Sequence, residues 1–201
     1  MDIIIHGFIL ALGLILPLGV QNIFIFTQGA TQPTFIRALP ASISASICDT
    51  ILIVLSISGL SYIIVQMDWL RTILMIGGSL FLLYMSVAIW RTSPTNQIKG
   101  EALSTKKQIL FACSVSFLNP SALIDIIGVI GTSSLQYEGI DVVVFAISCI
   151  SVSWIWFFFL AVAGAHMKKI KNQEKVMTFF NKCAALFIFS MALYIAFNLF
   201  K

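Results

Sequence analysis

The sequence predicts an all-α integral membrane protein with six transmembrane helices, arranged as two inverted repeats of three helices. Of the 201 residues, 59% are hydrophobic and only 10% are charged, and the mean hydropathy is +1.01. Soluble domains carry about 25% charged residues. The apolar residues form continuous runs near the length of about 20 residues that a helix needs to cross a bilayer. A polar loop at residues 91–108 divides these runs into two sets of three.

The runs follow one another in a simple order, and polar residues or tryptophans bound them. The first contains Pro17, the second follows Arg37 and is long enough to tilt or to kink at Pro40, and the third lies between Trp69 and Trp90. The polar loop precedes the fourth, and two basic or acidic connections separate the last three. The expected spans are residues 4–27, 38–66, 69–90, 109–132, 140–165 and 178–200, within one transmembrane domain (1–201) whose half-repeats are 1–90 and 109–201. A five-span arrangement is the main alternative.

The basic residues predict the orientation of these spans. Ten of the twelve Lys and Arg residues fall in the connections after the first, third and fifth spans. The other side carries Asp2, Asp68, Glu138 and Asp141. Because short cytoplasmic loops are enriched in Lys and Arg, we expect the basic connections in the cytoplasm and both termini in the periplasm. The acidic start Met1-Asp2 lacks the features of a secretory signal.

Several classes of function are disfavoured by composition. The net charge of +4 comes from short loops, so it does not indicate a nucleic-acid partner. The cysteines are scattered through apolar segments without a Cys-x-x-Cys pair, as is typical of small buried residues; they are Cys48, Cys113, Cys149 and Cys183. We therefore expect neither a disulfide framework nor a bound metal or other cofactor. We expect membrane lipid to surround the protein, and the sequence is compatible with a homo-oligomer.

Two spans contain helix-breaking residues beside polar side chains. Pro17 and Gly19 interrupt the first span just before Gln21 and Asn22. Pro120, about a hundred residues later, follows Asn119 and precedes Asp125. Aligning the two prolines places Asn22 on Asp125, which is the pattern of a weak inverted repeat. A proline exposes a backbone carbonyl one turn earlier, and broken helices at mid-membrane bind ions and charged substrates in many transporters.

Two aspartates are expected deep within the spans. Asp49 lies twelve residues after Arg37, or roughly 18 Å along a helix, and shares a polar stripe with Ser42, Ser46 and Ser56. Asp125 belongs to a second stripe, which also includes Ser114, Ser121, Gly128 and Thr132. A charge at the bilayer centre costs at least about 2.5–3.5 kcal/mol, and no deep Lys or Arg is available as a neutralising partner. The stripes indicate two walls of a cation-binding cavity; the alternative is that each carboxylate only accepts structural hydrogen bonds.

These residues resemble motifs of one transporter family. Residues 16–22, Leu-Pro-Leu-Gly-Val-Gln-Asn, are similar to the Pro-Leu-Gly-Pro-Gln-Asn motif of the LysE/ArgO exporters of basic amino acids. Leu118-Asn119-Pro120 with Asp125 resembles a second motif, and Asp49 occupies the place of the family's second-span aspartate. Val20 departs from the motif, which has a second proline there. The order, the spacing and the chain length agree throughout.

The resemblance implies a bacterial inner-membrane exporter of L-lysine or L-arginine, a transporter and not an enzyme. Proton antiport by alternating access is the mechanism that we expect, with Asp49 and Asp125 able to hold either a proton or a cation. Asp125, Gln21, Asn22 and Asn119 then form the substrate shell, and Asp49 couples transport to protons. The alternatives are an exporter of neutral amino acids or of a divalent cation on the same fold, a thiol-redox carrier, and a structural subunit without transport.

Overall fold

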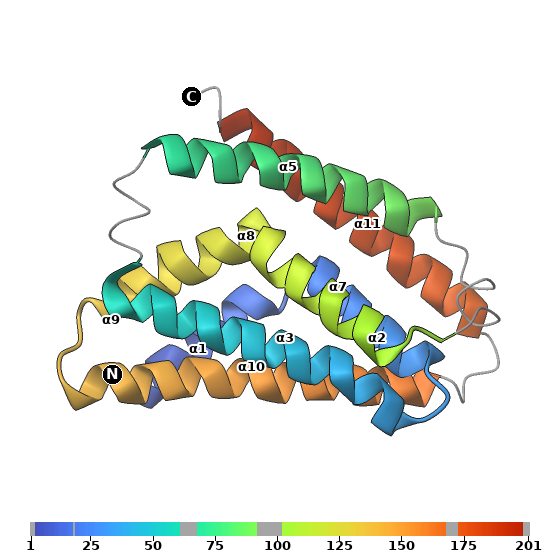
Figure 1. Cartoon of the computed structure of the whole chain (residues 1–201), viewed down its shortest axis with the longest axis horizontal. Coiled ribbons are helices and arrows are strands. Elements are labelled where there is room, and N and C mark those ends of the chain that lie inside the picture. Colours follow the sequence, from blue (N-terminus) through green and yellow to red (C-terminus); the bar gives the residue numbers. More distant parts are fainter. Residues whose placement is uncertain (1–2, 18, 61–67, 92–101, 168–172, 199–201) are drawn as a thin grey trace.

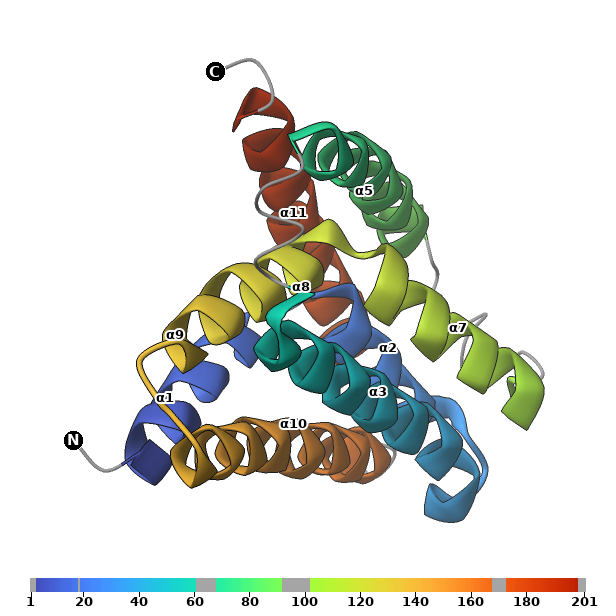
Figure 2. The same cartoon turned by 60° about the vertical axis from the view of Figure 1, so that its left-hand side comes forward.

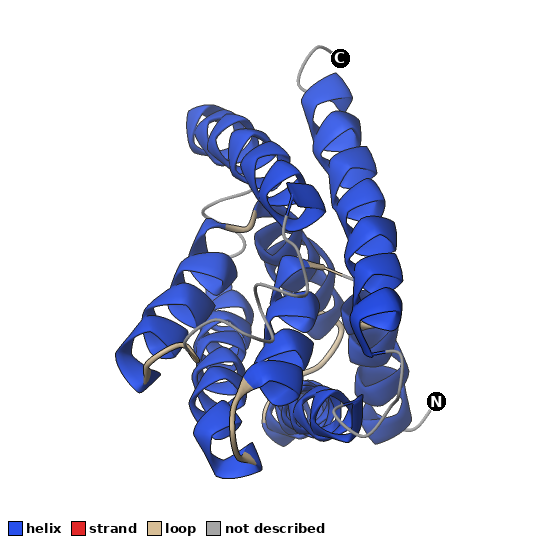
Figure 3. Ribbon diagram, turned by 90° about the vertical axis from the view of Figure 1, so that its right-hand side faces the viewer, coloured by secondary structure: helices blue, strands red, loops and turns tan. Residues whose placement is uncertain are grey.

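The computed structural model describes residues 3–17, 19–60, 68–91, 102–167 and 173–198, and every regular element in these ranges is a helix (Figures 1 and 3). The all-helical prediction is therefore confirmed for this part of the chain. The elements, in which η marks a π-helical turn, are α1 (Ile3–Ile15), α2 (Val20–Thr31), α3 (Phe35–Leu55), η1 (Ser56–Leu60), α5 (Asp68–Arg91), α7 (Thr105–Leu118), α8 (Pro120–Leu123), η2 (Ile124–Gly131), α9 (Thr132–Ser134), α10 (Ile140–Met167) and α11 (Gln173–Asn198).

The first apolar run is broken where the sequence predicts a break. Helices α1 and α2 meet at an angle of 79°. Pro17 has no backbone N–H and so cannot continue the hydrogen-bond ladder of α1. Gly19 is extended, with φ −72° and ψ 169°, and its N–H donates to the carbonyl of Pro17 over 2.7 Å. The break thus follows from local backbone chemistry.

The fourth apolar run has a second break. Helix α7 ends at Leu118, and Asn119 is extended, with φ −85° and ψ 108°. The chain resumes as a helix at Pro120, where the fixed φ of proline suits the first helical position, and it continues through the π-helical η2. A π-helical turn changes the spacing of residues along a face. The expected stripe from Ser114 to Thr132 is therefore not continuous, and Thr132 is exposed.

The second apolar run kinks near its end and not at its proline. Helix α3 continues through Pro40, and the irregularity lies in η1, where Gly59 has a positive φ of 96°. Glycine adopts this left-handed conformation without steric cost. Residues 61–66 of the expected span lie outside the described residues, as does most of the polar loop after α5.

The helices pack in three layers. Helices α5 and α11 pair with each other on one side, α10 lies with α1 and α3 on the other, and α2, α7 and α8 lie between them (Figures 1 and 2). Helices α2 and α10 cross very closely at Gly29 and Gly164, because a Cβ at either position would overlap a backbone carbonyl oxygen of the other helix. Small residues of this kind let transmembrane helices approach.

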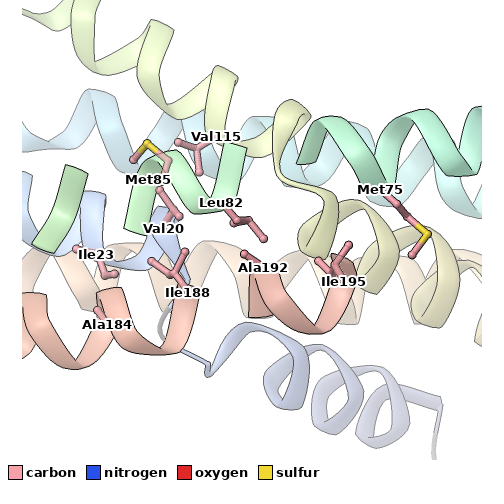
Figure 4. Packing of buried hydrophobic residues seen from close by; sticks show 10 residues of the cluster. All are labelled: Val20, Ile23, Met75, Leu82, Met85, Val115, Ala184, Ile188, Ala192 and Ile195. Atoms are coloured by element: carbon pink, nitrogen blue, oxygen red, sulfur yellow. The ribbon is translucent and has the colours of Figure 1, made fainter. Parts of the chain in front are cut away.

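A buried apolar cluster joins the α5–α11 pair to the middle layer. Its residues come from α2, α5, α7 and α11, and their side chains meet in the space between these helices (Figure 4); they are Val20, Ile23, Met75, Leu82, Met85, Val115, Ala184, Ile188, Ala192 and Ile195. Two further clusters surround α10, one beside α1 and η2 and one beside α2 and α3.

The two ends of the bundle differ in charge. At the end where α2 stops and α3 and α7 begin, on the right of Figure 1, the exposed basic residues include Arg37, Arg91, Lys106, Lys107 and Lys175. We call this the basic end. The opposite end, where α1 begins and α11 stops, carries the exposed acids Glu138 and Asp141.

The chain is a multi-pass membrane protein. Among the described residues, three stretches are long and apolar enough to cross a membrane alone: Phe35–Gly59, Ile140–Met167 and Lys175–Phe197. The bent pair α1–α2 can provide a fourth crossing. The apolar part of α5, Met75–Arg91, is shorter, and the break at Asn119 divides the expected fourth span. The six-span arrangement with two repeats stays a prediction.

Candidate functional site

A cavity of about 330 Å³ lies where the two helix breaks meet. This volume is at the lower end of the range of about 300–1,000 Å³ for small-molecule sites. Its walls include α1, α3, α10 and α11 as well as the breaks. Seven residues that were proposed from the sequence for the breaks and the substrate shell line it, namely Pro17, Gly19, Gln21, Asn22, Asp49, Asn119 and Asp125. Helix α8 starts at Pro120, directly after Asn119.

Asn22 holds the first break in place. Its side-chain amide Nδ2 donates to the carbonyl of Ile15 over 2.7 Å and to the carbonyl of Pro17 over 2.8 Å. These carbonyls lack helical partners because the chain is broken after Ile15. Both amide hydrogens of Asn22 are used in this way, so only its carbonyl oxygen is left to face a ligand. From the sequence, Asn22 is expected in the substrate shell, and the geometry adds this structural role.

Gln21 lies beside Asn22 and reaches toward Asp49. Its carbonyl Oε1 accepts a hydrogen bond of 3.0 Å from the hydroxyl of Ser116. Its amide Nε2 is buried near the Asp49 carboxylate but makes no hydrogen bond of ordinary geometry with any described residue. A buried donor without a partner is costly, so this amide is poised to donate to a ligand or to Asp49.

Asp49 projects from the middle of α3 and is 8% exposed. The hydroxyl of Ser153 on α10 and the amide of Gln21 lie beside its carboxylate. No basic side chain of the described residues forms an ion pair with it. A buried carboxylate in this setting is stable only when it is protonated, hydrogen-bonded or paired with a cation.

Asp125 supplies the second carboxylate, from the first turn of η2. It is less buried than Asp49 and lines the same cavity. It too has no ion pair with any described residue. Asn119, which lies in the break just before α8, is 6% exposed and shares this wall. The cavity therefore receives one carboxylate and one or two amides from each half of the chain.

The sequence did not predict that Ser153 lines the cavity, nor which apolar residues do. Helix α10 is apolar on all sides, so its serines give no periodic signal, and only packing shows which of them faces Asp49. The apolar lining includes Phe157 of α10, Leu82 of α5 and Phe187 of α11. Such surfaces can hold the aliphatic part of a ligand while the polar groups orient it.

The remaining polar candidates do not form a metal centre. Among the described residues, no three His, Cys, Asp or Glu side chains lie close enough to share a metal ion. All four cysteines are free thiols, and the Sγ atoms of Cys48 and Cys113 are 3.5 Å apart, between α3 and α7. These two thiols lie outside the cavity lining.

Comparison with known proteins gives a consistent result. The family model described as "LysE type translocator" matches residues 12–199. The chain is 52% identical over its full length to "Putative amino-acid transporter YisU" of Bacillus subtilis (strain 168), covering 91% of that protein. It is 29% identical over 196 residues to "Arginine exporter protein ArgO" of Escherichia coli (strain K12), covering 95% of this chain and 92% of the relative. The protein of that name from Salmonella enteritidis is 28% identical over the same length. No solved structure matches.

Proposed function

We propose that this chain, which belongs to the LysE type translocator family and is an amino-acid exporter, exports cationic amino acids across the bacterial inner membrane. L-lysine and L-arginine are the proposed substrates. The observation that carries the proposal is the cavity between the two breaks, which is lined by two carboxylates that form no ion pair with any residue that the structure describes. The relatives named as arginine exporters give independent support.

The proposed binding mode assigns each part of the substrate to a part of the cavity. Asp125 pairs with the cationic side chain, and Phe157 and Phe187 contact its aliphatic stem. The start of α2, with its free backbone N–H groups and the amide of Gln21, receives the α-carboxylate, because the N-terminus of a helix attracts negative charge. Asn119 completes the shell, and the Asn22 carbonyl faces the α-ammonium group.

The coupling mechanism that we propose is proton antiport. An inside-negative potential opposes cation export by about 2.3 kcal/mol per charge per 100 mV, so a uniporter would accumulate its substrate. Exchange of one inward proton for one outward cation removes this charge term. Asp49 is the proposed coupling residue, since its carboxylate can release a proton when the substrate cation enters and bind one again when the substrate leaves.

The packing supports two inverted half-repeats and alternating access. If α1–α2, α3 and α5 correspond to α7–η2, α10 and α11, then corresponding helices contact each other: α5 packs on α11, and α3 packs on α10. This is what a two-fold axis through the centre of the bundle would produce. In the proposed orientation, the basic end faces the cytoplasm and both termini face the periplasm.

Efflux from proteoliposomes tests these proposals directly. Purified protein is reconstituted with labelled lysine, arginine, threonine or leucine inside, with and without a pH gradient. We expect efflux of lysine or arginine that accelerates when protons flow the opposite way. A preference for threonine or leucine would refute the cationic substrate class, and rates independent of the pH gradient would refute antiport.

Two matched variants test the carboxylates. Asp49→Asn and Asp125→Asn keep the size of each side chain and remove its charge. We expect each to reduce efflux at least tenfold, and Asp125→Asn to weaken substrate binding more than Asp49→Asn does. The exposed Asp141→Asn at the acidic end is the control and should export normally. Wild-type rates in both cavity variants would eliminate the carboxylate mechanism.

A further inference from the structure

Buried polar side chains lie at two levels between α2, α3 and α7. Beside the cavity are Asp49, Gln21, Ser116 and Ser46, and neither serine has any exposed surface. At the basic end, beyond the buried Ala41, Ala45 and Ala112 of an apolar cluster, are three buried glutamines, Gln28, Gln32 and Gln108. We call these residues the polar seam. Only Asp49 and Gln21 of the seam line the cavity, so the other members separate the cavity from the basic end.

Several atoms of the seam lack hydrogen-bond partners. Four buried side-chain atoms of the described residues have no partner, and three of them belong to the seam: Nε2 of Gln21, Oγ of Ser46 and Oε1 of Gln108. A buried polar atom without a partner destabilises the state in which it is buried. Opening of the seam would let water or substrate form hydrogen bonds with all three atoms. These hydrogen bonds would offset part of the free energy needed to open the seam.

A glutamine cluster closes the seam at the basic end. The amide of Gln32 donates to Gln28 over 3.0 Å and to the backbone carbonyl of Leu103 over 2.9 Å. The amide of Gln108 donates to the same Leu103 carbonyl over 3.0 Å and to the carbonyl of Arg37 over 2.9 Å. These hydrogen bonds connect the C-terminal end of α2 and the first turn of α3 to the start of α7, which belongs to the other half of the chain.

The contact between α3 and α7 is suited to separation. Along the seam, α3 presents the fully buried small residues Ala41 and Ala45, and α7 presents Ala112. Small side chains let helices approach closely, and at this contact neither helix buries a large side chain. The aromatic rings of the same cluster, Phe24 and Phe111, pack between α2 and α7 with their centroids 4.3 Å apart. Cys48 and Cys113 form another contact of these two helices, with their Sγ atoms 3.5 Å apart.

We propose that the polar seam between α2, α3 and α7 is the gate through which the cavity opens toward the basic end, and that the glutamine cluster is its latch. The inference rests on the proposed transport function for its purpose, but the movement can be measured without any substrate. A cationic amino acid that passes along the opened seam meets the glutamine amides, then the small apolar residues Ala41, Ala45 and Ala112, and then the serine hydroxyls and the Asp49 carboxylate. No Lys or Arg is among the buried polar residues of the described chain.

The cysteine pair tests the gate with little change to the chain. Cys149 and Cys183 are replaced by alanine, and iodine then oxidises Cys48 and Cys113 to a disulfide, with loss of two thiol protons and formation of two iodide ions. Mass spectrometry gives the cross-linked fraction. We expect efflux to fall in proportion to that fraction and to return after reduction with a phosphine. The variant that also carries Cys113→Ser should keep its efflux after iodine treatment.

The cross-link also has to be separated from damage to the site. Cross-linked protein should still bind labelled arginine presented from the acidic end, because the cavity itself is unchanged. Full efflux by protein that is fully cross-linked would overturn the gate. Loss of binding from both ends would overturn it as well, since the cross-link would then act on the cavity.

Thiol labelling tests the latch without reference to transport. In a protein without other cysteines, Ser46→Cys places one thiol on the seam. A membrane-impermeant thiosulfonate is then added from the side of the basic end. A separate protein with Lys106→Cys as its single thiol shows which side of the membrane this is. We expect Gln108→Ala to raise the labelling rate about tenfold, because two hydrogen bonds of the latch are lost. The control is Gln136→Ala at the acidic end, whose amide bonds the Ser133 carbonyl over 2.9 Å.

The labelling result is independent of which amino acid is exported. A rate with Gln108→Ala no higher than with Gln136→Ala would overturn the latch, and faster labelling from the acidic end would overturn the direction of opening. If labelling behaves as expected while efflux of lysine and arginine is absent, the gate stands and the proposed substrate is wrong.

Discussion

Replacement of Gly164 by alanine should push α2 and α10 apart. A Cβ on Gly164 would overlap the backbone carbonyl oxygen of Phe26 and lie only 3.0 Å from the backbone N of Ala30 and 3.1 Å from Cα of Gly29. All three neighbours are backbone atoms, so no side-chain rotation can relieve the overlap. The helices must separate, and the apolar contacts around Phe157 and Ala161 must loosen with them.

The size of the effect follows from two opposing terms. Alanine is favoured over glycine inside a helix by about 0.5–1 kcal/mol. Overpacking of a well-packed interior costs typically about 1–3 kcal/mol, and more where the backbone has to move. Because the new Cβ overlaps backbone atoms of α2, the cost should lie in the upper part of that range, about 2–3 kcal/mol. We therefore expect Gly164→Ala to lower the free energy of unfolding by about 1–2.5 kcal/mol overall.

Reversible unfolding in mixed micelles, followed by circular dichroism, measures this difference. The matched control is Gly77→Ala on α5, where a Cβ would meet nothing within 4 Å. Since only the helix-propensity term acts there, Gly77→Ala should be neutral or stabilising. Efflux should fall in the Gly164 variant, because Ser153 of α10 and Gln21 of α2 both lie beside the Asp49 carboxylate.

A double-mutant cycle tests the reasoning further. A Cβ on Gly29 would overlap the carbonyl oxygen of Ala161 at the same crossing. Once one substitution has separated the helices, the second should cost much less than it does alone. Strict additivity of the two losses, or equal stability of Gly164→Ala and Gly77→Ala, would refute the close backbone crossing.

Three further outcomes follow from single contacts. Asn22→Asp removes both donors that hold the first break and places a carboxylate against the two carbonyl oxygens, which lie 2.7 and 2.8 Å from the amide nitrogen. We expect it to lower the free energy of unfolding by about 2–4 kcal/mol and to abolish most efflux; near-normal efflux would contradict the structural role of this amide. Ser153→Ala should raise the substrate KM about three- to tenfold by removing a donor beside Asp49, whereas the exposed Ser151→Ala should leave it unchanged. Tyr137→Phe removes the 2.6 Å hydrogen bond to His6 and should cost about 0.5–1.5 kcal/mol of unfolding free energy with export intact; a loss of export without a loss of stability would assign this contact a role in transport.

Some features of the site could be predicted because their cause is local. A proline lacks an N–H wherever it stands, and a glycine or an amide beside it marks a helix end in the sequence itself. The breaks at Pro17 and before Pro120 were therefore predicted from a few neighbouring residues. Asp49 was identified in the same way, because a carboxylate deep in an apolar run costs free energy and is therefore a candidate functional residue.

Other features could not be predicted because their cause lies between helices. In a soluble protein the apolar stripe of a helix reveals its buried face, but a membrane helix is apolar toward lipid as well as toward its neighbours. The pattern of α10 therefore gives no sign that Ser153 faces Asp49 while Ser151 is exposed. The stripe through Asp125 also failed as a continuous face, because its α-helical spacing does not survive the break at Asn119 and the π-helical turn after it.

The sequence alone determined that this chain is a helical membrane protein with two broken segments and two deep carboxylates, since composition and backbone chemistry act over short distances. Only the tertiary structure decided that both breaks line one cavity with Asp49 and Asp125. It also decided that Gly29 and Gly164 cross in contact and that Gln32 and Gln108 share the carbonyl of Leu103. The hydrogen bond from Gln32 to Leu103 joins residues 71 positions apart, and that from Ser116 to Gln21 joins residues 95 positions apart. No local pattern specifies which helix faces meet.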